Sequence, residues 1–217
     1  MLQGLKFCVL AFSALLPVIN PLGSALLFLS VVGHAPPDIF RQLARRVAVS
    51  TVIFLLIIEL AGATLLAFFG ISLPVVQFAG GFVLAAMGWG LLNTRDKATA
   101  PSPAEASSGP LEEKIFYPLT FPITAGPGTI VVTLTLSAHA SGRSIFDTVA
   151  GHLGIALAIV GLGVTVLLSY VYAPTITQKI SPSTVQGILR VVAFVLLCIG
   201  VQIAWNGLQA MLKAVPK

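Results

Sequence analysis

Long charge-free stretches alternate with short charged connectors along the chain. There are five such stretches. Four contain no Asp, Glu, Lys or Arg: residues 7 to 37, 115 to 142, 148 to 178 and 191 to 212. The fifth, residues 47 to 92, contains one charged residue, Glu59. A helix of roughly 20 apolar residues crosses a hydrocarbon core of about 30 Å. The pattern therefore predicts one membrane span in each of the four and two spans in residues 47 to 92, separated near Gly70 and Pro74.

We therefore expect an all-α integral membrane bundle of six transmembrane helices. The predicted spans are residues 5 to 32, 47 to 69, 74 to 93, 116 to 138, 148 to 171 and 185 to 210. The first span could be read as a secretory signal. However, it lacks a small-x-small cleavage site and is interrupted by Asn20 and Pro21, so we expect it to be retained.

Composition supports a membrane protein and excludes the main soluble classes. Of the 217 residues, 57% are hydrophobic and 9% are charged, and mean hydropathy is +1.00, whereas soluble domains are about 25% charged. The net charge of +5 does not indicate nucleic-acid binding, because the basic residues lie in short connectors and not along one stripe. We expect the lipid bilayer as a partner and no nucleic acid, and a homo-oligomer is compatible with this composition.

The distribution of basic residues predicts the orientation in the membrane. Seven Lys and Arg residues lie in the first, third and fifth connectors, and four lie on the opposite side. Cytoplasmic loops of membrane proteins carry an excess of Lys and Arg. Both termini are therefore predicted to be non-cytoplasmic.

The two halves of the chain resemble each other. Residues 17–24 and residues 122–129 each contain a proline, a second proline after a short gap, then a glycine and a hydroxyl residue. We expect a first repeat over residues 1–93, a second over residues 116–217, and a flexible cytoplasmic linker rich in Pro, Ser and Ala over residues 94–115. Because each half has an odd number of spans, the second must run in the opposite sense. Many secondary transporters use such inverted repeats.

Each repeat is predicted to begin with a broken helix. Asn is a favoured N-cap and Pro is favoured at the first helical position, so we expect one half-helix to end near Leu16 and another to start at Asn20. Gly126 and Pro127 predict the same arrangement in the fourth span. Free N–H groups at the new helix starts suit a carboxylate, and released carbonyls suit an ammonium group. The residues expected to bind such a solute are Asn20, Pro21, Gly23, Ser24, Thr124, Gly126, Pro127, Gly128 and Thr129.

Further polar residues inside the spans are candidates for proton coupling or a polar pathway: Glu59, Gln77, Arg190 and Gln202. An ionisable group such as Glu59 is costly at mid-membrane and is a functional candidate by default. The alternative is a protonated Glu59 that only hydrogen-bonds a neighbouring helix. Amides in spans also serve as helix contacts, and Arg190 can extend to the interface. His139 and His152 lack companions at metal-ligand spacing, so we expect no metal and no cofactor.

Several of these motifs together resemble the MarC family of bacterial inner-membrane proteins over nearly the whole chain. They are residues 20–23, 69–72, 79–81 and 124–130, and Arg190 ahead of residues 200–202 and 206–207. The resemblance implies a six-span protein of the bacterial inner membrane. The SnatA-like members of the family move small neutral amino acids. The resemblance also implies distant kinship with LysE-type exporters. Gln77 stands where members often carry Arg, so a role of that arginine cannot be carried over.

We therefore expect a secondary transporter, and not an enzyme, that moves small neutral amino acids such as alanine or glycine by alternating access. The resemblance alone favours export over uptake. The alternative is a membrane enzyme or assembly factor that acts on a lipid or prenyl substrate in the same cavity. The chain carries no nucleotide-binding G-x-x-x-x-G-K-[ST] motif, so we expect no ATP-driven pumping by this chain alone.

Overall fold

Helices make up the fold. The computed structural model describes residues 2–33, 35–93, 112–140 and 144–214, and these ranges contain no strand. The helices in chain order are α1 (Leu2–Ile19), α2 (Pro21–Val32), α3 (Pro37–Phe68), α4 (Leu73–Asn93), the π-helix η2 (Ile115–Thr124), α5 (Pro127–Ala140), α6 (Ile145–Val171), α7 (Ala173–Lys179) and α8 (Pro182–Lys213).

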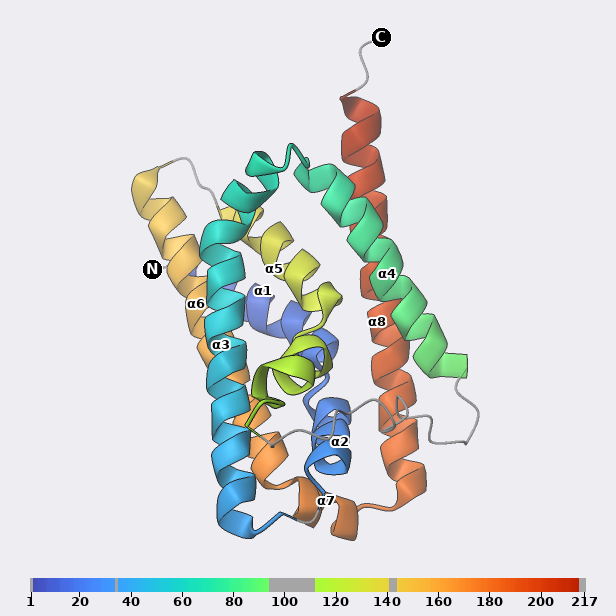
Figure 1. Cartoon of the computed structure of the whole chain (residues 1–217). Coiled ribbons are helices and arrows are strands. Elements are labelled where there is room, and N and C mark those ends of the chain that lie inside the picture. The colour runs from blue at the N-terminus through green and yellow to red at the C-terminus, as the bar shows by residue number, and fades with distance from the viewer. Residues whose placement is uncertain (1, 34, 94–111, 141–143, 215–217) are drawn as a thin grey trace.

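The six predicted spans are confirmed as helical segments. The first is divided between α1 and α2, and the fourth between η2 and α5. Within the described residues, five helices are long and apolar enough to cross a membrane, and η2 with α5, bent by 68°, makes a sixth when the two are taken as one span. The short helix α7 was not predicted. It lies between α6 and α8 at one end of the bundle (Figure 1).

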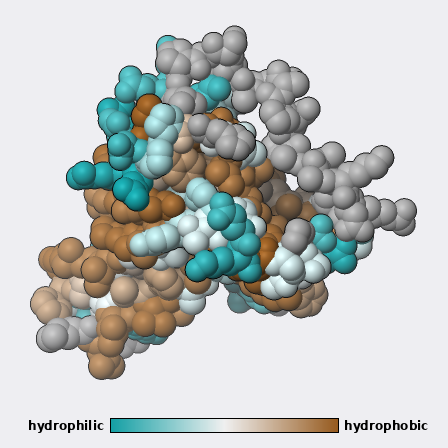
Figure 2. All heavy atoms as spheres, turned by 90° about the horizontal axis from the view of Figure 1, so that it is seen from below, coloured by the Kyte–Doolittle hydropathy of each residue, from teal (hydrophilic) through white to brown (hydrophobic). Residues whose placement is uncertain are grey.

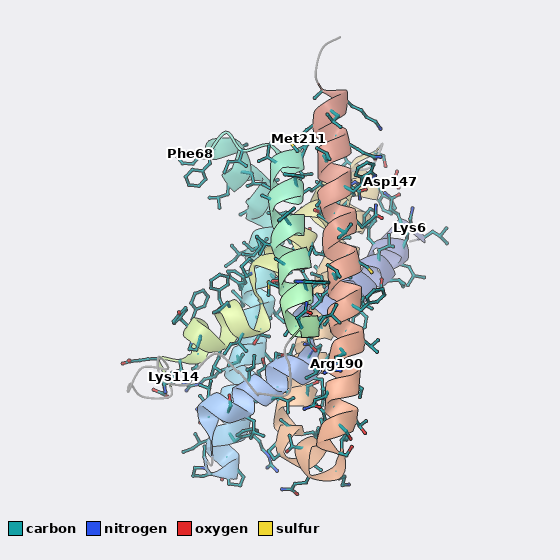
Figure 3. The ribbon with its side chains drawn as sticks, turned by 90° about the vertical axis from the view of Figure 1, so that its right-hand side faces the viewer. Lys6, Phe68, Lys114, Asp147, Arg190 and Met211 are labelled. Atoms are coloured by element: carbon teal, nitrogen blue, oxygen red, sulfur yellow. The ribbon has the colours of Figure 1, made fainter. Side chains whose placement is uncertain are left out.

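The flanks of the bundle are apolar and its polar groups lie toward the ends. Large apolar side chains such as Leu60, Phe82 and Val191 are exposed on the helices, as expected for a surface in contact with lipid. Figure 2 looks onto the end that carries α7 and shows hydrophilic side chains gathered there above apolar flanks. Lys6, Asp147 and Met211 lie toward the opposite end, away from Arg190 (Figure 3). The two ends thus separate the connectors as the sequence predicts.

Helices α4 and α8 pack against each other through glycines. A Cβ on Gly88 would lie 2.6 Å from the backbone nitrogen of Leu197, and a Cβ on Gly207 would lie 2.6 Å from that of Phe78. The two contacts run in opposite chain directions, so the helices are antiparallel. Since no side chain fits between the backbones here, these glycines permit the close approach that membrane helices use in place of hydrophobic burial. Figure 1 shows the pair along one side of the bundle.

The core lies among α1, α2, α3, α5 and α6. It contains the fully buried side chains Leu15, Phe28, Leu55 and Ile159. Helices α1 and α6 run side by side, because a Cβ on Gly4 would lie 2.9 Å from the carbonyl oxygen of Ala150. The core therefore packs against one face of the first span, and the buried residues of the two breaks, such as Ser24 and Thr124, adjoin it.

The division into repeats stays a prediction. Residues 94–111 of the predicted linker lie outside the described residues. At its described end, Glu112 makes an exposed ion pair with Arg46 of α3 at 2.9 Å. The helix pairing is compatible with inverted repeats, since α4 packs on α8, α3 packs on α6, and the first and fourth spans meet at their breaks.

Candidate solute site at the paired helix breaks

The first break is confined to Asn20. This residue has φ 45° and ψ 66°, a left-handed conformation that Asn tolerates better than most residues. Its side-chain oxygen accepts a hydrogen bond from the backbone N–H of Gly23 at 3.2 Å. Asn20 is therefore the N-cap of α2 and Pro21 its first residue, as the sequence predicts.

The end of the preceding half-helix was predicted incorrectly. Helix α1 continues to Ile19 and contains Pro17, whereas the sequence predicted an end near Leu16. The backbone hydrogen bond from Asn20 N–H to the Leu16 carbonyl, 3.0 Å long, remains intact. Because this bond is kept, Pro17 does not end the helix, and only Asn20 turns the chain.

The second break is more irregular than the first. The segment before it is a π-helix, η2, with non-helical backbone at Tyr117 and Phe121 and cis peptide bonds before Pro118 and Pro122. The predicted half-helix is therefore wrong for this segment, because a chain with prolines at these positions cannot keep α-helical hydrogen bonds. Beyond the break, α5 begins at Pro127, as predicted.

Much of the hydrogen-bonding capacity at the breaks is satisfied internally. The N–H of Ser24 bonds to the carbonyl of Asn20 at 2.9 Å, and the N–H of Thr129 bonds to that of Gly126 at 3.0 Å. The hydroxyl of Thr129 donates to the same Gly126 carbonyl at 2.7 Å. The free donors that the sequence predicted at the helix starts are thus partly capped by the protein's own oxygens.

The two breaks lie against each other. A Cβ built on Gly128, at the start of α5, would lie 3.1 Å from Cγ1 of Val18, at the end of α1. The same Cβ would lie 2.7 Å from Cδ2 of Leu84 on α4. Gly128 therefore allows α5 to approach both neighbours, and in this conformation protein side chains fill the space beside it.

A tyrosine on α6 joins the breaks. The hydroxyl of Tyr170 lies 2.6 Å from that of Thr124 in the second break, and the Ser24 side chain of the first break lies beside it. The Ser24 hydroxyl itself donates to the Pro21 carbonyl at 3.3 Å. The ring of Tyr170 stacks on Phe28 with centroids 4.5 Å apart. One phenol thus contacts both breaks from a third helix.

The predicted solute-binding residues differ in burial. Those that lie inside the protein are Ser24, Thr124, Gly128 and Thr129. Those that are half-buried are Asn20, Pro21, Gly23 and Gly126, and Pro127 is exposed. The structure brings both groups into one region, and their role in binding stays a prediction.

Glu59 is buried but does not lie at the breaks. A hydrogen bond joins the carboxyl group of Glu59 to Nδ1 of His152 on α6. Which of the two groups is the donor depends on where the proton resides. The exposed fraction of the Glu59 side chain is 1%, and that of His152 is 30%. His152 precedes Tyr170 by about 27 Å of helix rise along α6. The pair therefore lies toward the end of the bundle opposite Tyr170.

The other predicted pathway residues are spread over α4 and α8. Gln77 is buried, and its amide donates to the hydroxyl of Thr135 on α5 at 3.5 Å. Arg190 and Gln202 are exposed on α8, and Gln202 donates to the side-chain oxygen of Asn206 at 2.9 Å. Helix α8 packs mainly on α4. Neither Arg190 nor Gln202 joins the cluster at the breaks.

An apolar hollow lies on the outside of the bundle. It has a volume of about 490 Å³ and is lined by apolar parts of α1 and α6, among them Cys8, Phe12, Leu157 and Gly161. The hydroxyl of Ser13, also in this lining, donates to the Leu10 carbonyl of its own helix. This groove is suited to an acyl chain, and it does not include the breaks.

Sequence reasoning missed Tyr170 and His152 as partners. Tyr170 lies near the end of a span, where Tyr is usual as an interfacial anchor, so its sequence position gave no reason to place it inside. Glu59 and His152 are both ionisable residues inside apolar spans. That shared feature was the signal from which their pairing could have been inferred. Among the described residues, no three His, Cys, Asp or Glu side chains are grouped to hold a metal.

These features define a multi-pass helical membrane protein with two broken spans that meet. A model of the family described as "MarC family integral membrane protein" matches residues 5–212. The inner membrane protein MarC of Citrobacter koseri is 30% identical over 98% of this chain and 99% of its own length. That of Escherichia coli O1:K1 is also 30% identical over the same shares. The chain belongs to the MarC family. No solved structure matches it.

Proposed function

We propose that the protein is a secondary transporter that exports small neutral amino acids such as alanine or glycine by alternating access. The observation that carries this proposal is the meeting of two chain breaks on the Tyr170 hydroxyl, through Ser24 and Thr124. Irregular backbone within a membrane is tolerated where it is buried in protein or lines a watery cavity. Transporters place such breaks at their substrate sites.

The chemistry at the breaks suits a zwitterion. The Asn20 side-chain oxygen at the Gly23 N–H, 3.2 Å away, occupies a position that a substrate carboxylate oxygen could take. The carbonyl of Gly126 already accepts the Thr129 hydroxyl at 2.7 Å, and an ammonium group could compete for it. A small side chain is required, because Leu84 and Val18 pack tightly around Gly128.

Alternating access requires contacts between helices that can open and close. The contacts between the breaks are a few hydroxyl hydrogen bonds and side-chain packing, whereas the α4 and α8 backbones pack closely through glycines. We propose that the breaks separate at Tyr170 to admit the solute. Each opening exchanges the internal caps for contacts with the solute.

The alternative is a membrane enzyme or assembly factor for a lipid or prenyl substrate. The apolar groove between α1 and α6 favours contact with such a molecule. However, its polar atom at Ser13 is already bonded to the Leu10 carbonyl. The groove therefore offers a place for an acyl chain without evident chemistry, and we favour transport.

Counterflow in proteoliposomes tests the proposal. Vesicles that hold the purified protein and unlabelled alanine should accumulate labelled alanine transiently, and protein-free vesicles should not. Competition by glycine and by bulky leucine measures the size limit that Leu84 and Val18 impose. Folded protein that exchanges none of a panel of neutral amino acids would contradict the proposal and favour the lipid alternative.

A further inference from the structure

The Glu59 and His152 pair has an unused hydrogen-bonding atom. One carboxylate oxygen of Glu59 contacts Nδ1 of His152, and the other, Oε2, is buried without a partner among the described residues. The Glu59 side chain is almost fully enclosed, whereas His152 is partly exposed. His152 thus connects an enclosed carboxyl group to the surroundings of α6.

A row of hydroxyls on α5 leads from the breaks toward this pair. Thr129, Thr133 and Ser137 are spaced four residues apart, so they lie on one face of the helix, and all are buried. The row covers about 12 Å of helix rise. At one end the Thr129 hydroxyl bonds to the Gly126 carbonyl. At the other, the Ser137 hydroxyl donates to the backbone carbonyl of Glu59 at 2.8 Å.

The middle of this row also has an unused atom. Oγ1 of Thr133 is buried with no hydrogen-bond partner among the described residues. Successive hydroxyls are about 6 Å apart along the helix, close to the length of two hydrogen bonds of about 2.8 Å through one water molecule. The hydroxyls of Thr51 and Thr124, by contrast, have carbonyl partners. The unpaired atoms thus lie on the path between Glu59 and the break.

We infer that the Glu59 and His152 pair is the proton-binding site of the transporter, and that the Thr129, Thr133 and Ser137 hydroxyls form its hydrated path to the chain breaks. This inference rests on the proposed function. The pair holds one proton between the Glu59 carboxyl and Nδ1 of His152. With that proton the pair has no net charge, and without it the pair carries one negative charge in a buried place.

The proton balance follows from this arrangement. A proton enters from the side where α6 begins, through partly exposed His152, and binds to the pair. It leaves along the hydroxyl row toward the break as water enters the open pathway. One proton then moves inward for each solute that moves outward, and no bond other than those to the proton is made or broken.

In the part of the chain that the structure describes, Glu59 has no ion-pair partner besides His152. On α1, which packs against α6 near His152, the charged residue is the exposed Lys6. Among the described residues packed around α3, helix α6 contributes His152, and α5 contributes His139, whose exposed ring bonds to the Thr135 carbonyl. Asp147 on α6 is bonded to Ser144 at the helix start. Arg46 and Glu112 pair with each other far along α3, about 20 Å of helix rise from Glu59.

The test compares two assays in the same proteoliposomes. Counterflow at equal pH requires only exchange, whereas accumulation driven by a pH gradient requires proton movement. With one proton per solute, a gradient of one pH unit should drive about tenfold accumulation of alanine by the wild type. Glu59→Gln and His152→Gln should keep counterflow and lose this accumulation. His139→Gln, a histidine change on the neighbouring exposed face, should keep both.

The hydroxyl path has its own variant. Thr133→Val removes an unpaired hydroxyl at nearly constant shape, so the fold should be kept, and gradient-driven accumulation should slow severalfold at unchanged counterflow. Thr51→Val, at a buried hydroxyl bonded within its own helix, is the matched control and should not slow accumulation. Equal rates for Thr133→Val and the wild type would overturn the path.

The outcomes separate the two proposals. Absence of counterflow by folded wild-type protein overturns the transport proposal and the proton site with it. Wild-type counterflow without gradient-driven accumulation overturns the proton site alone, as does full accumulation by Glu59→Gln. If Glu59→Gln loses counterflow as well, His152→Gln decides, since its amide can still bond Glu59 but cannot hold the proton.

Discussion

The hydroxyls of Tyr170 and Thr124 lie 2.6 Å apart inside the protein. The Thr124 hydroxyl also donates to the Leu119 carbonyl at 2.6 Å, so the proton between Thr124 and Tyr170 comes from the phenol. Tyr170 is therefore the donor to the second break while the Ser24 hydroxyl contacts it from the first. Any movement that separates the two breaks must give up one of these contacts.

The left-handed turn at Asn20 predicts an order of stability. Asn20→Gly removes the cap on Gly23 and keeps the backbone conformation, so it should cost only a few tenths of a kcal/mol. Asn20→Ala must in addition hold a left-handed conformation, at a further cost of about 1–2 kcal/mol. Thermal unfolding in detergent measures both, and an alanine variant as stable as the glycine variant would contradict the assigned backbone.

Tight packing at Gly128 predicts a coupling to Leu84. Gly128→Ala places a Cβ 2.7 Å from Cδ2 of Leu84, so it should destabilise the protein by about 1–3 kcal/mol. Leu84→Ala alone leaves a cavity and costs about 2–5 kcal/mol. The double variant should cost less than the sum by at least about 0.5 kcal/mol. Additive effects would show that the two residues do not touch.

Two glycines on α8 should respond to alanine with opposite signs. A Cβ on Gly200 would lie 2.7 Å from the carbonyl oxygen of Gly81 on α4, whereas a Cβ on Gly187 would meet nothing within 4 Å. Gly187→Ala should therefore raise helix stability by about 0.5–1 kcal/mol, and Gly200→Ala should lower the unfolding temperature. A Gly200→Ala protein as stable as the wild type would argue against the close α4 and α8 pair.

Cysteine labelling tests the predicted orientation. In a protein without Cys8 and Cys198, Ser72→Cys lies in the exposed turn between α3 and α4, and Glu113→Cys lies at the opposite end, before η2. A membrane-impermeant maleimide should label Ser72→Cys in intact cells and Glu113→Cys only after permeabilisation. The reverse pattern would place the termini in the cytoplasm.

The fold could be predicted because the membrane imposes simple rules. A charge-free stretch long enough to cross the bilayer forms a helix, so the spans were found from charge alone. Asn20 with Pro21 and Gly126 with Pro127 carry local cap signals, and both helix starts fall where those signals place them. The end of α1 and the π-helix were missed, because they depend on which backbone hydrogen bonds survive next to proline.

The partners within the site could not be predicted from local signals. Tyr170 meets Ser24 and Thr124 only after three spans pack together, and no sequence spacing encodes that packing. The same holds for Glu59, whose partner His152 lies on a helix from the other half of the chain. Arg190 was predicted as a pathway residue from its charge. Helix α8 carries it on an exposed face, and its role stays a prediction.

Equilibrium binding of labelled alanine to the purified protein tests most directly whether the two breaks form one solute site. Tyr170→Phe removes the hydroxyl that joins them and keeps the ring on Phe28, and Tyr172→Phe, at an exposed tyrosine, is the control. We predict that the wild type and Tyr172→Phe bind alanine alike and that Tyr170→Phe binds it at least tenfold more weakly. Equal affinity in all three folded proteins would contradict the account.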